Sequence, residues 1–264
     1  MIYKPEEFMH VDYLWNDEEV NNLDAVENLI YRSNILGSDL RITNTGGGNT
    51  SAKIMDKDPL TGTEVEVLWV KGSGGDLRTS VKENFATLYQ EKLNSLNNVY
   101  QSFEDKGYKE KGEDRMVGMF PHCVFNLNPR ASSIDTPLHF MIDEKHVDHM
   151  HSNAVIAVAT CKDQVALTET IWGGKLAYMP WIRPGWEAAL LLKKTYEANP
   201  GIDGVLMGQH GHINWANESK ACYDLSLSIA ERAARFIEEH DKGEFVRRRK
   251  ISVSLRTGTC RFTL

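Results

Sequence analysis

The sequence lacks the cysteine patterns of a disulfide framework or a zinc finger. Its four cysteines are far apart in a chain of 264 residues, and none forms a Cys-x-x-Cys pair. We therefore expect reduced, mostly packed thiols. The sequence also lacks a run of about 18 apolar residues that could span a membrane. The acidic segment 1–19 has no apolar stretch typical of a signal peptide. These absences favour a cytoplasmic protein with no membrane partner.

An excess of positive charge is also missing. The formal net charge is -7, and no long basic face with interleaved aromatic residues occurs, which argues against nucleic acid as a partner. With 41% hydrophobic and 25% charged residues, the composition is that of a globular protein. We expect one domain over residues 1–240. Residues 241–264 differ by the basic run Arg247–Lys250 and could form an edge strand, an intersubunit arm or a disordered tail.

Neither the Walker nor the dinucleotide-binding spacing of glycines occurs, yet two segments are rich in glycine. Thr45–Ser51 contains three consecutive glycines, and Lys71–Leu77 follows an expected strand and adds a lysine and a serine. Glycine allows positive φ and lets successive N–H groups face an anion. The two segments together favour a small phosphorylated metabolite, although the first alone could be a plain turn. Lys71 could be a cation for that phosphate or a surface residue at the end of a strand.

Histidines form two His-x-His pairs. His149 and His151 would point to the same side of an extended backbone, and neutral imidazole is a common ligand of catalytic divalent metals. Two polar residues at the end of a strand are the alternative. His210 and His212 follow an expected buried strand, where an α/β fold tends to place site residues. Because a catalytic metal keeps an open coordination position, we expect only His210 of this pair to be a ligand.

Asp135 lies between two hydroxyl residues and Pro137, and two interpretations are open. It could cap a helix that begins at the proline. It could instead face the metal site, where it would be suited to proton transfer. His139, one helical turn later, is expected as a packing histidine.

Hydrophobic periodicity and capping signals predict both helices and strands. In chain order we expect a helix at 21–31, a strand at 65–70, a helix from Ser80 that carries Phe85 and Leu88, a strand at 121–128, a strand-and-turn region at 164–180, a helix at 187–199, a strand at 204–207 and a last helix from Asn217 to about His240. Residues 104–115 are nearly all charged or glycine, which predicts a surface loop.

The order of these motifs resembles that of the class II aldolase/adducin family. Ser133–His139, Val147–His151 and Lys71–Leu77 are most similar to the aldolase half of bifunctional rhamnulose-1-phosphate aldolase/lactaldehyde dehydrogenases. The resemblance covers about residues 20–240. It implies a three-layer α/β/α sandwich around a mainly antiparallel sheet. It also implies a homotetramer with sites near the subunit interfaces.

The resemblance further implies reversible cleavage of a ketose 1-phosphate, with L-rhamnulose 1-phosphate as the expected substrate. Zn²⁺, or another divalent metal, would bind His149, His151 and His210, and Asp135 would be the catalytic residue. The residues implied for binding the substrate's phosphate are Gly48, Asn49, Ser73, Gly74 and Ser133. An epimerase or dehydratase with the same zinc site is an alternative. A non-catalytic adducin-like scaffold is another, although a scaffold has no need of three converging imidazoles.

Two departures from the family pattern matter. Most of these aldolases have a catalytic glutamate where this sequence has Asp135, which is one methylene shorter. In having aspartate at this position, the sequence resembles the bifunctional subgroup. The glycine pattern of that subgroup's dehydrogenase half does not occur, so we expect no redox activity of this chain.

Overall fold

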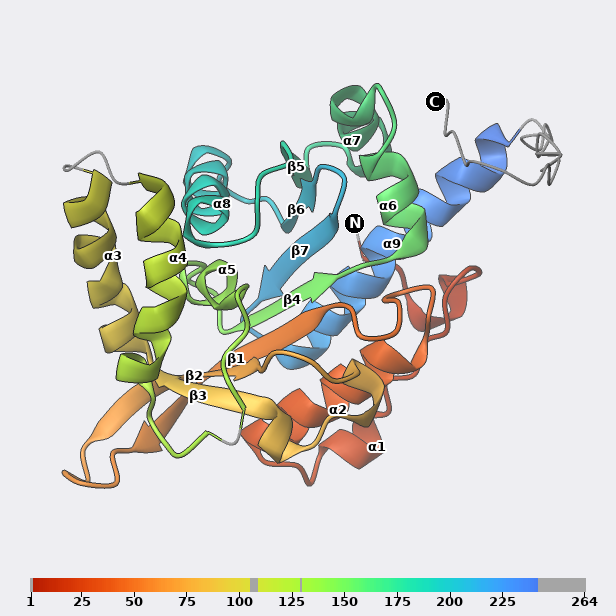
Figure 1. The fold of residues 1–264 in the computed structure, drawn as a ribbon. Coiled ribbons are helices and arrows are strands. Elements are labelled where there is room, and N and C mark those ends of the chain that lie inside the picture. Colours follow the sequence, from red (N-terminus) through yellow and green to blue (C-terminus); the bar gives the residue numbers. More distant parts are fainter. Residues whose placement is uncertain (1, 105–108, 129, 242–264) are drawn as a thin grey trace, which may run out of the picture.

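The central feature of the fold is one sheet of seven strands with helices on both sides (Figure 1). A computed structural model describes residues 2–104, 109–128 and 130–241 of the chain. The strands are β1 (Asn49–Lys57), β2 (Glu64–Lys71), β3 (Phe85–Tyr89), β4 (His146–Met150), β5 (Leu176–Met179), β6 (Gly204–Met207) and β7 (Gly211–Ala216). Their order across the sheet is β3-β2-β1-β4-β7-β6-β5.

The sheet is mixed. Only β5 and β6 are parallel, and the other neighbouring strands are antiparallel. The predicted α/β class is confirmed. The expectation of a mainly antiparallel sheet is corrected to a mixed sheet with a majority of antiparallel pairs, because the crossover through α8 brings β6 back beside β5 in the same direction.

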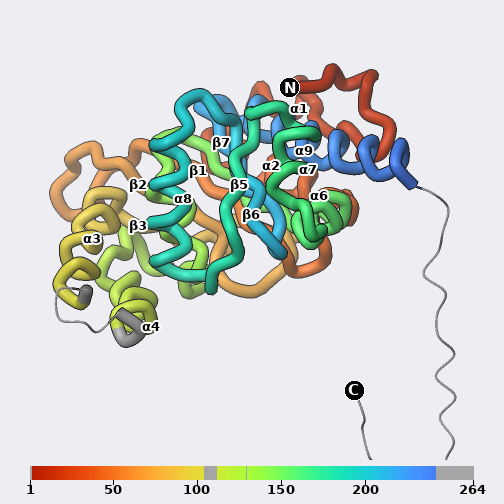
Figure 2. Tube along the Cα trace, turned by 90° about the horizontal axis from the view of Figure 1, so that it is seen from above, coloured from red at the N-terminus to blue at the C-terminus, as the bar shows by residue number. Residues whose placement is uncertain are grey.

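The helices form a layer on each side of the sheet. They are α1 (Asp17–Val20), α2 (Ala25–Ser38), α3 (Gln90–Glu104), α4 (Lys109–Met119), α5 (Thr136–Phe140), α6 (Asn153–Ala159), α7 (Gln164–Trp172), α8 (Trp186–Ala198) and α9 (Ser219–His240), with short 3-10 helices at Pro5–Glu7, Leu77–Thr79, Lys82–Asn84 and Phe120–Cys123. Apolar residues of α3, α4, α5 and α8 share one core cluster. Those of α2, α6, α7 and α9 share another. Both views place α3 and α4 at the opposite end of the molecule from α6 and α7 (Figures 1 and 2).

The segment after Ser80 differs from its predicted secondary structure. It was expected as a helix, but Phe85–Tyr89 is strand β3, paired with β2, and the helix begins only at Gln90. Phe85 packs on one side of the sheet, and Leu88 packs on the other. A strand buried on both sides has a continuous apolar sequence that resembles a buried helix, so periodicity could not distinguish them.

The charged segment 104–115 also differs from the expected surface loop. Lys109–Met119 forms α4, which packs against α3. Met116 lies in the core cluster and is 1% exposed. A buried face therefore holds a helix that is rich in charged residues, since packing outweighs composition.

Two regions expected to contain strands differ from that expectation, and only the second contains one. Residues 121–128 form the end of a 3-10 helix and a single bridge between Val124 and Leu88. The segment 164–180 contains α7 before β5. Gly173 ends α7 in the left-handed conformation, with φ of 58°, as helix C-termini often require.

The ends of the described chain meet on α9. The backbone N–H groups of Met9 and His10 donate hydrogen bonds to the Glu231 carboxylate, so the N-terminal segment lies along this helix (Figure 2). The predicted helices at 187–199 and 217–240 agree with α8 and α9 within two residues. The tail predicted for residues 241–264 lies outside the described residues, apart from Asp241. Among the described residues, no helix is long and apolar enough to cross a membrane.

Candidate metal centre and active site

Three of the predicted site histidines come together at the ends of β4 and β6. His149 lies in β4, His151 follows this strand, and His210 lies in the turn between β6 and β7. The Nε2 atoms of His149 and His151 are 3.0 Å apart, and those of His151 and His210 are 3.1 Å apart. All three ligand atoms lie within 4.8 Å of one another. Two nitrogens on one tetrahedral zinc are about 3.4 Å apart, so this group could hold a metal ion.

The tautomer of His149 is set by the backbone. Its Nδ1 atom lies 2.9 Å from the carbonyl oxygen of His212, which can only accept a hydrogen bond. Nδ1 therefore has the proton, and the Nε2 lone pair points into the group of three. Metal-binding histidines commonly use their second nitrogen in this way. His212 thus contributes its carbonyl, while its own ring is fully buried and is not one of the three rings in the group.

Burial keeps the three imidazoles neutral. It lowers the pKa of His149 well below the ordinary value, lowers that of His151 to about 4, and lowers that of His210. The negative charge of Asp135 opposes the shift at His151 and at His210. Three neutral nitrogens beside one carboxylate form a site suited to a divalent cation.

The turn that carries His210 is strained. Gln209 has φ of 58°, and it is the only non-glycine residue with positive φ in the described part of the chain. Its N–H group donates to the carbonyl oxygen of Ala159, which fixes the turn to the end of α6. Such conformations persist where the surroundings impose them, and they often occur at functional sites. The strain therefore serves to direct His210 toward His149 and His151.

The first glycine-rich loop packs directly against the histidines. A Cβ atom on Gly47 would lie 2.8 Å from Nδ1 of His151. A Cβ atom on Gly48, whose φ is +72°, would lie 3.0 Å from the carbonyl oxygen of His149. The glycines are therefore required by close contact with the metal group. This contact does not test the predicted role of Gly48 in phosphate binding.

Asp135 faces this group and does not cap the helix with its side chain. It occupies the N-cap position of α5, but its carboxylate makes no capping hydrogen bond. Oδ2 instead accepts a hydrogen bond of 2.8 Å from Nδ2 of Asn49, the first residue of β1. The N–H group of Asp135 donates to Oγ of Ser133, at 3.1 Å. Asn49 and Ser133, both predicted for phosphate binding, thus surround the acidic residue.

The structure decides between the two alternatives for the position of Lys71 in the second glycine-rich loop. Lys71 is only 3% exposed, so it is not a surface residue. Its Nζ atom is 3.4 Å from the carbonyl oxygen of Gly74, and burial lowers the pKa of this amine. The N–H group of Ser73 donates to the carbonyl oxygen of Ala131, so the loop is tied to the segment that leads to Asp135.

Sequence reasoning missed two residues near these loops. His139, expected as packing, is fully buried and forms hydrogen bonds to both Asn49 and Ser51. Its spacing of four residues from Asp135 was the available signal. Arg130, which no motif indicated, places Nη1 3.8 Å from the position of a Cβ atom on Gly74.

Comparison with known proteins agrees with this geometry. Residues 27–237 match the family described as Class II Aldolase and Adducin N-terminal domain. The chain belongs to the class II aldolase/adducin family. Its members are generally lyases, and in this member three histidines form a group that could hold a metal ion.

One curated relative of this class II aldolase family member is the uncharacterized oxidoreductase YuxG of Bacillus subtilis. The identity is 35% over 230 residues, which are 87% of this chain and 32% of YuxG. The chain therefore spans about a third of that relative's length.

Two solved structures illustrate the shared fold. The N-terminal class II aldolase domain of a conserved protein from Thermoplasma acidophilum has a TM-score of 0.69 at 25% identity, covering 85% of this chain and 96% of that domain. An L-fuculose 1-phosphate aldolase has a TM-score of 0.56 at 15% identity, covering 84% of this chain and 88% of that one. At the latter identity the likeness concerns the fold alone.

Proposed function

We propose that this chain is a zinc-dependent aldolase that reversibly cleaves L-rhamnulose 1-phosphate, a ketose 1-phosphate, to dihydroxyacetone phosphate and lactaldehyde. The observation that supports this proposal most directly is the convergence of Nε2 atoms from His149, His151 and His210 beside Asp135. Three nitrogen ligands and an open position are the pattern of catalytic zinc sites. The same donor set would also accept another divalent metal.

The metal would be held by the three imidazoles and would act as a Lewis acid toward the substrate's carbonyl and hydroxyl oxygens. The C4 hydroxyl loses its proton and becomes the aldehyde carbonyl as the bond between C3 and C4 breaks, and the electron pair stays on C3. The proton lost at C4 balances the one that C3 gains. Asp135 delivers the proton that C3 then takes up, and in the direction of synthesis its carboxylate removes that proton. The hydrogen bond from Asn49 orients the carboxylate for this transfer.

The phosphate group is assigned to the two glycine-rich loops. The predicted contacts are Gly48, Asn49, Ser73, Gly74 and Ser133. Lys71 supports this assignment. Among the described residues its buried ammonium group has one hydrogen-bond partner, the carbonyl oxygen of Gly74 at 3.4 Å, so it gains from a nearby anion. Binding at these loops would fix the substrate relative to Asp135 and restrict its reaction geometry.

A homotetramer belongs to the proposal as well. Leu127 is 96% exposed, and Ile134, the neighbour of Asp135, is 41% exposed. Exposed apolar side chains gain from burial, and an interface between subunits would supply it. Light scattering coupled to size exclusion should give a mass four times that of one chain. A monomer at micromolar concentration would contradict this part.

The decisive experiment is a panel of ketose 1-phosphates tested for release of dihydroxyacetone phosphate, with and without chelator. We expect release from L-rhamnulose 1-phosphate that stops on chelation and returns with Zn²⁺. Turnover to an isomeric or dehydrated sugar phosphate without release would show an epimerase or dehydratase. A purified protein that neither binds zinc nor turns over any member of the panel would favour a non-catalytic scaffold. Redox activity, named for the much longer YuxG, is no part of the proposal.

A further inference from the structure

His139 lies at the end of a continuous series of hydrogen bonds that leads to Asp135. Its Nε2 atom is 2.7 Å from Oδ1 of Asn49, and its Nδ1 atom is 2.8 Å from Oγ of Ser51. Nδ2 of Asn49 donates to the carboxylate of Asp135 at 2.8 Å. The histidine is 0% exposed, so no water competes with these contacts.

The direction of each hydrogen bond follows from the chemistry of the groups. A carboxylate only accepts, so the Asn49 amide must turn its NH₂ group toward Asp135 and its oxygen toward His139. Nε2 of His139 must then have the proton, and Nδ1 must accept from the hydroxyl of Ser51. Burial lowers the pKa of His139 to about 3, which agrees with a neutral ring. Every group in the series thus has a defined role.

The backbone of His139 is fixed from the same strand. Asn49, Ser51 and Lys53 are alternate residues of β1 and share one face of the sheet. Nζ of Lys53 donates to the carbonyl oxygens of His139, Ile142 and Glu144, at 3.3, 2.6 and 2.7 Å. One face of β1 therefore holds both the ring and the carbonyl of His139.

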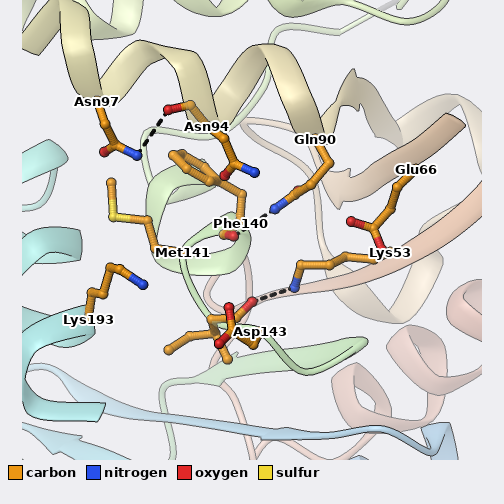
Figure 3. A pocket seen from close by; sticks show the side chains of 10 residues that line it. Lys53, Glu66, Gln90, Asn94, Asn97, Phe140, Met141, Asp143 and Lys193 are labelled. Carbon is orange, nitrogen blue, oxygen red and sulfur yellow. Dashed lines mark hydrogen bonds between the residues drawn. The ribbon is translucent and has the colours of Figure 1, made fainter. Parts of the chain in front are cut away.

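Figure 3 shows the cavity that Lys53 lines. Lys53 lies at the wall of a polar cavity of about 210 Å³, next to Glu66 and Asp143. Gln90 lines the same cavity and donates to the carbonyl oxygen of Phe140, the last residue of α5. The cavity thus adjoins the end of α5 remote from Asp135, and polar side chains bind the helix at that end.

We propose that His139 is a positioning residue for proton transfer and that it acts through Asn49 on Asp135. The inference rests on the proposed aldolase function. A carboxyl group on a short side chain turns freely about its last torsion. The amide of Asn49 is held in place by His139. It binds Oδ2 of Asp135 and leaves Oδ1 of Asp135 for the substrate. Without the histidine, Asn49 can rotate and the carboxylate loses its fixed orientation.

The test separates proton transfer from cleavage. Dihydroxyacetone phosphate is incubated with the zinc-loaded enzyme in D₂O without aldehyde. Incorporation of deuterium at its hydroxymethyl carbon, which becomes C3 of the ketose, is followed by NMR. His139→Leu should lower both this exchange and kcat by about 10²-fold, the loss typical of a misplaced catalytic group. Zinc content should stay unchanged, and any rise in KM through the predicted phosphate contact of Asn49 should be much smaller than the fall in kcat. His139→Gln, which restores a donor toward Asn49, should recover much of the rate.

Two further variants keep the test sharp. His146→Leu removes another buried histidine, one bonded to Arg32 and not to Asn49, so it should lower stability without this loss of exchange. Ser51→Ala removes only the hydroxyl that fixes the His139 tautomer, and it should lower the exchange rate less than His139→Leu does. It is the variant to measure if His139→Leu does not fold. Equal losses in His139→Leu and His146→Leu, or a fall in zinc content, would overturn the inference. A wild-type enzyme that shows neither exchange nor cleavage would overturn the proposed function as well.

Discussion

The two faces of β4 contain buried polar groups of opposite character. On one face, Asp148 accepts from Nε of Arg32 at 3.1 Å and from Oγ of Ser226 at 3.2 Å. Arg32 also binds Ser219 and the carbonyl oxygen of Ser51, so protein groups satisfy this network. On the other face, the Nε2 atoms of the three histidines converge on one another.

This difference indicates which buried polar group serves structure and which serves a ligand. A charged pair that the protein itself neutralises has nothing left to bind, whereas converging neutral nitrogens gain from a cation. Asp148 and His149 are adjacent in sequence, yet the alternation of the strand separates their roles. Each of the following substitutions alters one face and leaves the other as its control, whereas acid acts on both.

The largest effect is expected on the histidine face. His149→Ala should abolish zinc retention and lower release of dihydroxyacetone phosphate by at least about 10³-fold, because the charge that stabilises the transition state leaves with the metal. Metal content by mass spectrometry and the initial rate measure the two effects. The matched control is His146→Ala, which should retain zinc. Full activity of His149→Ala without zinc would contradict the proposed site.

The next effect concerns stability. Asp148→Asn leaves Arg32 buried without its counter-charge and should lower the free energy of unfolding by about 3–5 kcal/mol. Urea denaturation monitored by circular dichroism measures this change. The double variant Arg32→Met with Asp148→Leu should recover part of it, since no unpaired charge remains. A loss below about 1 kcal/mol in Asp148→Asn would show that the pair is not the main tie between α2 and β4.

Sequence and structure agree best where local geometry determines the result. The period of two along a strand predicted that the side chains of His149 and His151 point to the same side, and the position of His210 after an expected buried strand predicted a site residue. Whether Asp135 caps a helix or faces the site could not be decided from sequence, because its backbone does the first and its carboxylate does the second. The contact between His139 and Asn49 joins residues 90 positions apart, and only the pairing of distant elements could reveal it.

Acid should weaken both faces, because each contains histidines held neutral. Burial lowers the pKa of His151 to about 4 and that of His146 to about 2. Unfolded histidine titrates near 6.5, so between these values the unfolded chain binds more protons than the folded one. Metal-free protein should therefore lose stability as pH falls from 6.5 toward 4, by up to about 1.4 kcal/mol per pH unit for each such histidine.

Melting temperatures across this pH range, with and without zinc, measure that loss. His146→Gln should reduce the dependence of stability on pH by the equivalent of about one bound proton, both with and without zinc. His151→Gln should flatten it as well and should also abolish the stabilisation that zinc gives. If melting temperature falls with pH at the same rate in both variants and in the wild type, these histidines are not the groups that take up protons.

The smallest effect tests whether the Asp148 network is truly saturated. Ser226→Ala removes one neutral donor from Asp148 and should lower the free energy of unfolding by about 1 kcal/mol, as expected for a single hydrogen bond. Oδ2 of Asp148 would then lose its 3.2 Å contact, while the bond from Arg32 to Oδ1 remains. Zinc content and cleavage rate should not change, because Ser226 lies on the face of β4 opposite His149. A loss of zinc in Ser226→Ala would mean that the two faces are coupled and that the division between structural and ligand-binding groups is wrong.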